Sequence, residues 1–278
     1  MTPSTRTADD AIATLRRHRI IPKRITAISP VEAERKNGRQ AYRVDTRDGR
    51  VLKARHLRDP ELAQEVCELR AGLDEGFAPV LIRDGAVLLE AWIDGVVLTD
   101  ETAAPWAAEA GRLLGRLHIA PLGNGVASER STDVWRHGAQ GDLRILRDAG
   151  HVSEARSGAL AAALEQLDPQ TARATKVHHD FCPENLVVDV RGRVFVIDNE
   201  WVRIGVPEFD VGRTLCRWPM SPEAWQQFHD GYRHEAGPLE AFLFWRIVSA
   251  LFSARVQLQV APEGLDPVLG VLRASVAL

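Results

Sequence analysis

The alternation of hydrophobic and polar positions predicts strands in the first third of the chain. Five runs fit this pattern, at residues 24–29, 40–46, 50–57, 80–82 and 86–92. The pair Asp48-Gly49 separates two of them and is typical of a hairpin turn. Helices are predicted at residues 8–18 and from residue 59 onward, where apolar positions recur every three or four residues. We therefore expect a small antiparallel sheet with one main helix.

Beyond residue 93 the hydrophobic period becomes helical. The helices are expected at residues 106–118, 132–148, 153–167, 222–235, 239–258 and 267–276. One strand-turn-strand unit interrupts them, because residues 186–190 and 194–197 are apolar and β-branched around the turn Arg191-Gly192-Arg193. The pattern predicts an α+β protein of two lobes, with an N-terminal lobe at residues 1–93 and a C-terminal lobe at residues 94–278.

Composition indicates a soluble globular protein. The chain has 278 residues, of which 45% are hydrophobic, and it contains no run of 18 apolar residues. Its first residues lack the charged and apolar regions of a secretory signal. The 3 cysteines are far apart and odd in number, which fits a reducing compartment. We therefore expect a cytoplasmic protein without a membrane partner.

The charges of the chain are nearly balanced overall but uneven along it. A net charge of −3 gives no sign of a nucleic-acid surface. Residues 1–93 carry 17 basic and 14 acidic side chains, whereas residues 94–278 carry 18 and 24. The acidic excess in the second half favours a cationic ligand there.

Three polar side chains in the strand-turn-strand region indicate phosphoryl transfer. Asp180, Asn185 and Asp198 are separated by 5 and 13 residues. One carboxylate orients an acceptor hydroxyl in such reactions, while an amide and a second carboxylate hold Mg²⁺ against the phosphates. Each residue alone could be a turn residue, but the three together with two flanking strands favour the functional interpretation.

The same region resembles a known family. The motif His178-x-Asp180-x-x-x-x-Asn185, followed by Ile197-Asp198 and then Gly205-x-Pro207-x-x-Asp210, is similar to the aminoglycoside phosphotransferases. These are protein-kinase-like small-molecule kinases that also resemble choline kinases. The resemblance covers most of the chain in order and implies a bilobal protein-kinase-like fold.

The resemblance implies roles for these residues. Asp180 would be the catalytic base, and Asn185 and Asp198 would be the Mg²⁺ ligands. His178 would support the catalytic loop, and Asp210 would accept hydrogen bonds from its backbone. The phosphoryl donor would be ATP or GTP, and the acceptor would be a hydroxyl of a small molecule such as an aminoglycoside, an amino alcohol or another metabolite.

Further nucleotide contacts are expected in the first lobe. Lys53 lies on a strand upstream of a helix, which resembles the lysine and glutamate that clamp the phosphates in kinases. Glu65 is the favoured partner, although Glu61 and Glu68 share its helix face. Residues 88–95, between the two predicted lobes, resemble the kinase linker whose backbone binds the adenine edge. The backbone groups at the matching positions belong to Ala91 and Ile93. Mid-strand lysines and helix glutamates are otherwise usually solvated.

Some positions depart from the pattern of the family. Residues 34–40 hold one glycine where kinases have a glycine-rich run, so Arg35, Lys36 or Arg39 would supply charge to the phosphates, or the segment is an ordinary hairpin. His179 and Asn199 also stand where the family has a small and an aromatic residue. Cys182 is interpreted as a small buried residue.

Two other functions remain open on the sequence. A metal-dependent phosphohydrolase would use the adjacent pair His179-Asp180 and would need helices around it together with further ligands. A nucleotide-binding regulator of the same fold without transfer activity would fit the sparse phosphate loop. The presence of Lys53, Asp180, Asn185 and Asp198 together favours catalysis over both.

Overall fold

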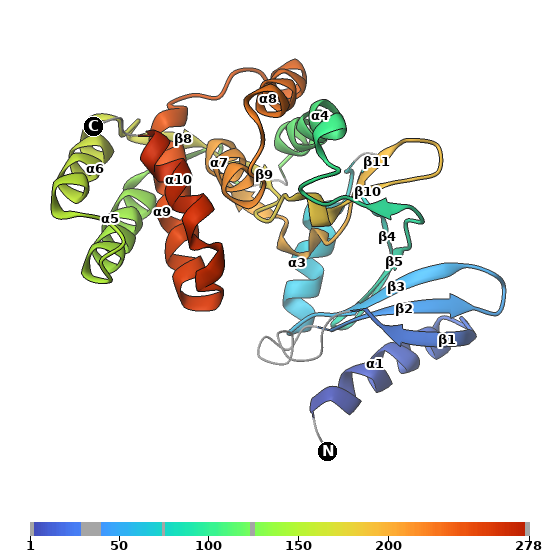
Figure 1. Ribbon diagram of the computed structural model, residues 1–278. Coiled ribbons are helices and arrows are strands. Elements are labelled where there is room, and N and C mark those ends of the chain that lie inside the picture. The colour runs from blue at the N-terminus through green and yellow to red at the C-terminus, as the bar shows by residue number, and fades with distance from the viewer. Residues whose placement is uncertain (1–2, 29–39, 74–75, 123–125, 276–278) are drawn as a thin grey trace. The chain divides into compact units, whose positions relative to one another are not determined.

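The computed structural model describes residues 3–28, 40–73, 76–122 and 126–275 (Figure 1). The chain forms two compact units. The first consists of residues 1–96 with 187–200, and the second of residues 97–186 with 201–278. The change of pattern near residue 93 lies close to the first boundary, while the return of residues 187–200 to the first unit has no signal in the hydrophobic period.

The first unit contains a five-stranded antiparallel sheet. Its strands are β1 (Pro22–Ala27), β2 (Gln40–Thr46), β3 (Val51–His56), β4 (Val80–Asp84) and β5 (Val87–Ala91), in the order β1-β2-β3-β5-β4. The predicted turn at Asp48-Gly49 joins β2 to β3, with Gly49 at φ 86°. Only glycine adopts this conformation readily, which is why the hairpin could be found in the sequence.

Two helices cover opposite faces of this sheet. From α1 (Pro3–Arg17), Ala11 and Leu15 join a buried cluster with Leu89 of β5. From α3 (Pro60–Arg70), Ala63 and Val66 pack instead with Leu88. Neighbouring residues of a strand point to opposite faces, so each helix has a face of its own. Asp59 caps α3 by accepting a hydrogen bond from the Leu62 amide at 2.7 Å.

Residues 187–200 form a hairpin attached to the first unit. The strands β10 (Leu186–Val188) and β11 (Val194–Val196) belong to a three-stranded sheet with β6 (Val96–Val97), in the order β11-β10-β6. Val196 forms a parallel bridge with Phe77, and the Ala78 amide donates to the Val196 carbonyl at 3.1 Å. These bonds fix the segment that leads directly into Asp198.

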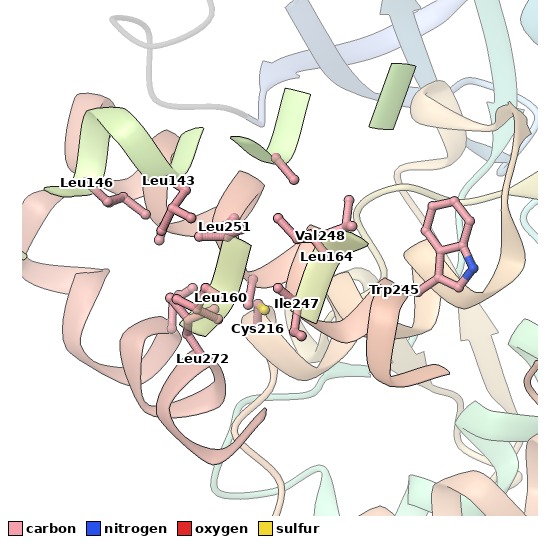
Figure 2. Packing of buried hydrophobic residues seen from close by; sticks show 14 of the residues in the cluster. Leu143, Leu146, Leu160, Leu164, Cys216, Trp245, Ile247, Val248, Leu251 and Leu272 are labelled. Carbon is pink, nitrogen blue, oxygen red and sulfur yellow. The ribbon is translucent and has the colours of Figure 1, made fainter. Parts of the chain in front are cut away.

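The second unit is mostly helical. Its helices are α4 (Ala107–Ile119), α5 (Asp133–Asp148), α6 (Glu154–Gln166), α7 (Pro207–Arg217), α8 (Pro222–Ala236), α9 (Phe242–Val260) and α10 (Leu265–Ser275). Side chains from α5, α6, α7, α9 and α10 form its main core, in which Leu143, Leu164, Cys216, Leu251 and Leu272 are buried (Figure 2). Helix α9 carries buried residues along most of its length, as expected for a helix inside a core.

Four short strands complete the second unit. The strand β7 (Glu129–Ser131) pairs with β8 (Thr171–Arg173), and β9 (Thr175–Val177) pairs with β12 (Arg203–Gly205), both antiparallel. Three-residue strands leave almost no hydrophobic period, so the sequence did not predict them. Strand β9 leads directly into His178.

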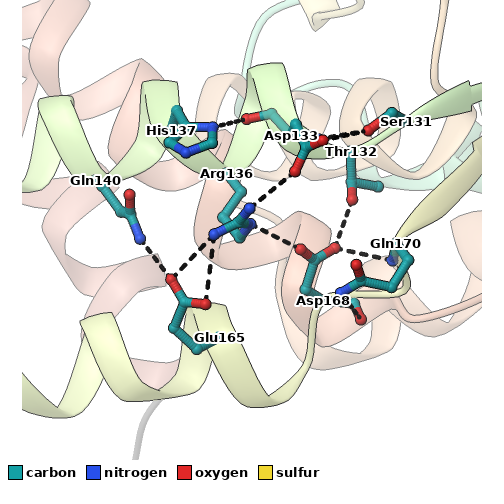
Figure 3. A network of polar contacts seen from close by, with 9 residues as sticks. All are labelled: Ser131, Thr132, Asp133, Arg136, His137, Gln140, Glu165, Asp168 and Gln170. Carbon is teal, nitrogen blue, oxygen red and sulfur yellow. Dashed lines mark hydrogen bonds and ion pairs between the residues drawn. The ribbon is translucent and has the colours of Figure 1, made fainter.

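A polar network fixes the start of α5 against the end of α6 (Figure 3). The Arg136 guanidinium contacts Asp133 at 2.8 Å, Glu165 at 3.2 Å and Asp168 at 2.9 Å. Thr132 donates a hydrogen bond to Asp168 at 2.5 Å. The Asp168 side chain is only 1% exposed, and these partners offset the cost of burying its charge.

The predicted fold class is confirmed, and most predicted helices are present. The sequence analysis missed one helix, α7. Proline is favourable at the first position of a helix, where Pro207 stands, but Gly212 in the middle of α7 has a low helix propensity. In the described part of the chain, no helix is both long and apolar enough to span a bilayer.

Helices α4 and α8 approach each other closely at glycines. A Cβ added to Gly111 would clash with the Phe228 carbonyl, and one added to Gly231 would clash with the Ala108 carbonyl. The clashing atoms belong to backbone, so a larger side chain cannot be accommodated by a rotamer change. These glycines allow the two helix backbones to touch.

We predict that Gly231→Ala lowers the free energy of unfolding by about 1–3 kcal/mol, because it overpacks this contact. Urea unfolding followed by tryptophan fluorescence would measure the loss. Gly138→Ala is the matched control, since Gly138 is exposed in α5 with nothing within 4 Å of an added Cβ. It should stabilise by about 0.5–1 kcal/mol. Equal effects of both variants would contradict the close contact.

Candidate active site

The loop between β9 and β10 carries the residues that the sequence singled out in the second unit. It runs through His178, His179 and Asp180 to a 3-10 turn at Pro183–Asn185. His179 has φ 68°, an unfavourable value for a residue with a side chain. Such a conformation persists only where the surroundings hold it.

Asp210 supplies this hold. Its carboxylate accepts hydrogen bonds from the amides of His178 and His179, both at 2.7 Å. The side chain is 1% exposed, and His118 Nε2 lies 3.1 Å from Oδ2. Nδ1 of His118 faces the Tyr232 hydroxyl at 2.9 Å. The structure thus gives Asp210 the backbone contacts that the resemblance implied.

The electrostatics of Asp210 favour its charged form. Burial opposes ionisation, but the hydrogen bond from His118 and the nearby imidazoles outweigh it and bring the pKa of the carboxyl to about 2. Amide donors stabilise a carboxylate in the same way. The loop is therefore anchored by a buried anion rather than by a neutral acid.

Asn185 lies beside Asp180 and has a free amide oxygen. Its Nδ2 donates to the Asp180 carbonyl at 2.8 Å and lies 3.4 Å from Oδ2 of the same residue. A carbonyl oxygen can only accept, so this bond fixes which end of the amide is nitrogen. In the described part of the chain no donor reaches the Asn185 side-chain oxygen, which leaves it available to a ligand.

Two arginines of α7 flank the Asp180 carboxylate. Arg217 Nε lies 3.3 Å from Oδ1, and an Arg213 terminal nitrogen lies 3.9 Å from the same oxygen. The Asp180 side chain is 30% exposed, so it remains open to solvent. Neither arginine was singled out in the sequence, although both follow Asp210 at helical spacing.

The remaining residues of the loop are held in apolar surroundings. Burial, and next the charges of Arg213 and Arg203, lower the pKa of His179 to about 4. Its ring packs between Phe209 and Phe252, with centroids 5.7 and 6.1 Å away. Burial, with Asp180 nearby, raises the pKa of Cys182 to about 12. His179 is thus neutral and Cys182 is an unreactive thiol at neutral pH.

His178 has a packing position. The residue is fully buried, and its ring meets Phe181 edge-on at 5.7 Å between centroids. This placement fits a structural role in the loop.

In the first unit, Asp198 forms ion pairs with two cations of β3. Lys53 pairs with its Oδ1, and Arg55 reaches the same oxygen at 2.9 Å. Arg55 also pairs with Glu200, whose pKa burial raises. Asp198 has φ 57°, a second unfavourable backbone value at a predicted site residue. Arg55 is a residue that the sequence reasoning missed, although it lies two positions from Lys53 on the same strand face.

The structure does not show the expected pairing of Lys53 with Glu65. Glu65 is exposed on α3, as are Glu61 and Glu68, and Lys53 contacts Asp198 instead. A clamp between Lys53 and Glu65 therefore stays a prediction.

The linker residues differ in their backbone contacts. The Ala91 amide donates to the Pro79 carbonyl at 3.0 Å, so it is already occupied. The Ile93 amide and carbonyl have no backbone partner in the part of the chain that the structure describes. Arg35, Lys36 and Arg39 lie outside the described residues.

Comparisons with known proteins identify the family. A sequence profile of the phosphotransferase enzyme family matches residues 36–246. The chain belongs to this family. The resemblance recognised in the motif is thereby confirmed. A search of curated proteins finds no significant match.

Solved structures share the fold of this phosphotransferase at low sequence identity. A candidate aminoglycoside phosphotransferase from Ralstonia eutropha has a TM-score of 0.68 at 16% identity, with 96% of this chain and 95% of that chain covered. The choline kinase LicA from Streptococcus pneumoniae gives 0.64 at 12%, covering 96% and 99%. The macrolide 2′-phosphotransferase MphH from Brachybacterium faecium gives 0.63 at 14%, covering 95% and 97%.

The phosphohydrolase alternative lacks a ligand set. His179 and Asp180 lie in a loop between a strand and a 3-10 turn, whereas that alternative requires helices around them. Among the residues described, no three His, Cys, Asp or Glu side chains are arranged to hold a metal ion. Together with the family, this arrangement favours phosphoryl transfer to an acceptor.

We predict that Asp210→Asn destabilises the phosphotransferase by about 2 kcal/mol at neutral pH. The amide replaces one acceptor by a donor that faces a loop amide. The native pKa of Asp210 lies below its ordinary value of 3.8, so its charge stabilises the fold above pH 4. This contribution is lost as the pH falls towards about 2.

The difference in unfolding free energy between the wild type and Asp210→Asn should therefore be constant above pH 4 and shrink below it. Urea titrations at several pH values would measure it. Asp148→Asn is the control, because Asp148 is exposed at the end of α5. A difference that stays unchanged down to pH 2.5 would show that Asp210 is not a buried anion.

Proposed function

We propose that this phosphotransferase moves the γ-phosphoryl group of ATP or GTP to a hydroxyl group of a small molecule. The observation that carries the proposal is the loop from His178 to Asn185. Asn185 holds the Asp180 backbone there, and Asp210 holds the two residues before it. The result is a solvent-accessible carboxylate on a fixed backbone, which is what the positioning of an acceptor requires.

The fold neighbours support the choice of substrates. LicA is named as a choline kinase and MphH as a macrolide phosphotransferase, and both names describe transfer to small molecules. A further structure of LicA contains AMP, which supports an adenine nucleotide as donor. For this chain we assign the adenine edge to the backbone of Ile93 and the Ala91 carbonyl.

Asp180 acts in this proposal as the residue that orients the acceptor hydroxyl. The hydroxyl oxygen forms a bond to the γ-phosphorus, and the bond from that phosphorus to the bridging oxygen breaks. The bridging oxygen keeps the electron pair and leaves with the nucleoside diphosphate. The hydroxyl proton passes to Asp180 and then to solvent. Positioning contributes more than basicity in such a loose transition state.

Mg²⁺ is the metal that the family resemblance implies, and the donor atoms fit it. The Asn185 amide oxygen has no hydrogen-bond donor in the described part of the chain, and Asp198 supplies a carboxylate. Mg²⁺ prefers oxygen ligands and is usually held by one or two side chains together with substrate phosphates. When bound, it offsets the negative charge of the phosphate oxygens.

Lys53 and Arg55 supply positive charge on the strand side. Both contact Asp198 in this structure. We propose that Lys53 turns to the phosphates of the bound nucleotide while Arg55, which also pairs with Glu200, keeps Asp198 in place. A buried guanidinium with two carboxylate partners is suited to this fixed role.

We predict that Asp180→Asn lowers the rate of phosphoryl transfer by about 10²–10⁴-fold and leaves nucleotide affinity within a few-fold. Asp198→Ala should instead abolish Mg²⁺-dependent nucleotide binding. Release of nucleoside diphosphate, with and without a mixture of hydroxyl compounds, measures the first effect. Calorimetric titration with ATP and GTP measures the second.

Asp148→Asn again serves as the exposed control and should leave both measurements unchanged. If the unmodified protein binds nucleotide but never turns it over with any acceptor, it is a nucleotide-binding regulator instead. If Asp180→Asn retains full transfer activity, the assignment of the acceptor site to this loop is wrong.

A further inference from the structure

Two arginines lie beside Asp180, although the second unit as a whole carries more acidic than basic side chains. Arg213 and Arg217 follow Asp210 on α7 by three and seven residues, so all three share one helix face. Both guanidinium groups point to the single Asp180 carboxylate. Two guanidinium groups thus converge on the carboxylate beside which the acceptor hydroxyl would bind.

Arg213 is the unusual member of this pair, because its side chain is only 12% exposed. In the described part of the chain, none of its N–H groups has a hydrogen-bond acceptor, and its Nε is completely buried without one. Its closest carboxylate oxygen, on Asp180, lies 3.9 Å away. A buried guanidinium with unmet donors is unfavourable unless a partner arrives.

The surroundings hold Arg213 in place without satisfying it. Its guanidinium lies over the Phe252 ring, 4.9 Å from the centroid. Arg255 lies over the same ring at 5.1 Å, but Asp142 neutralises Arg255 at 2.9 Å. Burial lowers the pKa of Arg213, which fits a cation that lacks full compensation.

Asp180 and Asp210 attract the charge of Arg213, but in the described part of the chain neither accepts a hydrogen bond from it. His179 is neutral, as described above, and Asp210 is occupied by the loop amides and His118. Glu184 and Asp100, two acidic side chains, act on Arg217 rather than on Arg213. A further positive charge comes from Arg203, which acts on His179. Arg217 is thus partly compensated, and Arg213 is the stronger anchor for a ligand.

We infer that the acceptor is an anion, a hydroxylated small molecule whose carboxylate or phosphate group binds Arg213 with help from Arg217. A guanidinium presents paired donors that match the oxygens of either group. The inference rests on the proposed phosphoryl transfer and adds the charge of the acceptor to it. It replaces the cationic acceptor that the acidic excess of residues 94–278 favoured, because local charge rather than total charge acts on a bound ligand.

An anionic acceptor undergoes the same bond changes as a neutral one. Its hydroxyl oxygen gains the phosphoryl group, the nucleoside diphosphate leaves with the electron pair of the broken bond, and the proton passes through Asp180. The acidic group of the acceptor takes no part in the chemistry. Its role is to place the hydroxyl beside Asp180.

The test is a matched panel of acceptors, with transfer read by mass spectrometry and by release of nucleoside diphosphate. Hydroxy acids of three to six carbons, beginning with glycerate, form one arm and sugar phosphates a second. The matching neutral polyols and hydroxy amines, including choline and an aminoglycoside, form the others. We expect kcat/KM to be highest in one of the two anionic arms, and which arm it is distinguishes carboxylate from phosphate.

The variant Arg213→Met, which keeps an unbranched stem but removes the guanidinium group and its charge, should lower kcat/KM for the preferred anion by about 100-fold, mainly through KM. The matching neutral polyol should lose less than about threefold. Arg213→Lys should restore part of the activity with the anion. Arg147→Met removes a half-exposed arginine at the end of α5 and serves as the control, with no change expected for any acceptor.

Preference for neutral or cationic acceptors would overturn the inference while leaving the proposed function intact. An equal loss with every acceptor in Arg213→Met would also overturn it, because Arg213 would then act on the transferred phosphoryl group. If no compound is phosphorylated, the proposed function fails. Calorimetric titration of the nucleotide-free protein with glycerate, glycerol 3-phosphate, glycerol and choline then decides the inference, which requires anion binding that Arg213→Met abolishes.

Discussion

The buried carboxylate of Asp210 is the interaction on which the second unit's site depends. It accepts hydrogen bonds from two successive loop amides and contacts His118, and its own side chain is 1% exposed. Two short bonds to adjacent amides fix the direction of the chain at His178 and His179. This hold offsets the cost of the positive φ of His179 and determines where the next residue, Asp180, points.

Helix α7 connects Asp210 to the proposed acceptor site and to the core of the second unit. One face of the helix carries Asp210 and the two arginines near Asp180. Another part of it packs on α9, where Gly212 lies against Ser249 so closely that a Cβ would not fit. The loop backbone, the guanidinium groups and the main core of the unit are therefore positioned by one element. A shift of this helix would displace all of them together, because packed interiors do not deform gradually.

In the first unit, ion pairs between charged side chains hold Asp198 in place. Lys53, Arg55 and Glu90 lie on the sheet face that α3 covers, away from the apolar face under α1. Arg55 binds both Asp198 and Glu200, while Arg70 at the end of α3 pairs with the buried Glu90. Each buried charge has an opposite charge beside it, which is the condition for its burial. In the proposed function, a nucleotide would meet a charge network that is already closed, so its binding would require an exchange of partners within this network.

The sequence by itself determined the class of fold, most of the helices and the loop motif. The hairpin turn at Asp48-Gly49 and the motif from His178 to Asn185 each depend only on residues close together in the chain, so a short stretch of sequence is enough to recognise them. Helix α7 was missed because Gly212 weakens the helical signal of this segment. A glycine is needed there because Ser249 of α9, more than thirty residues later in the chain, leaves no room for a Cβ. The sequence favoured Glu65 among three glutamates as the partner of Lys53, whereas the structure pairs Lys53 with Asp198, 145 residues away. Only the tertiary structure decided these contacts and the excess of arginine at Asp180, because the sign of a local field depends on which distant side chains fold next to each other.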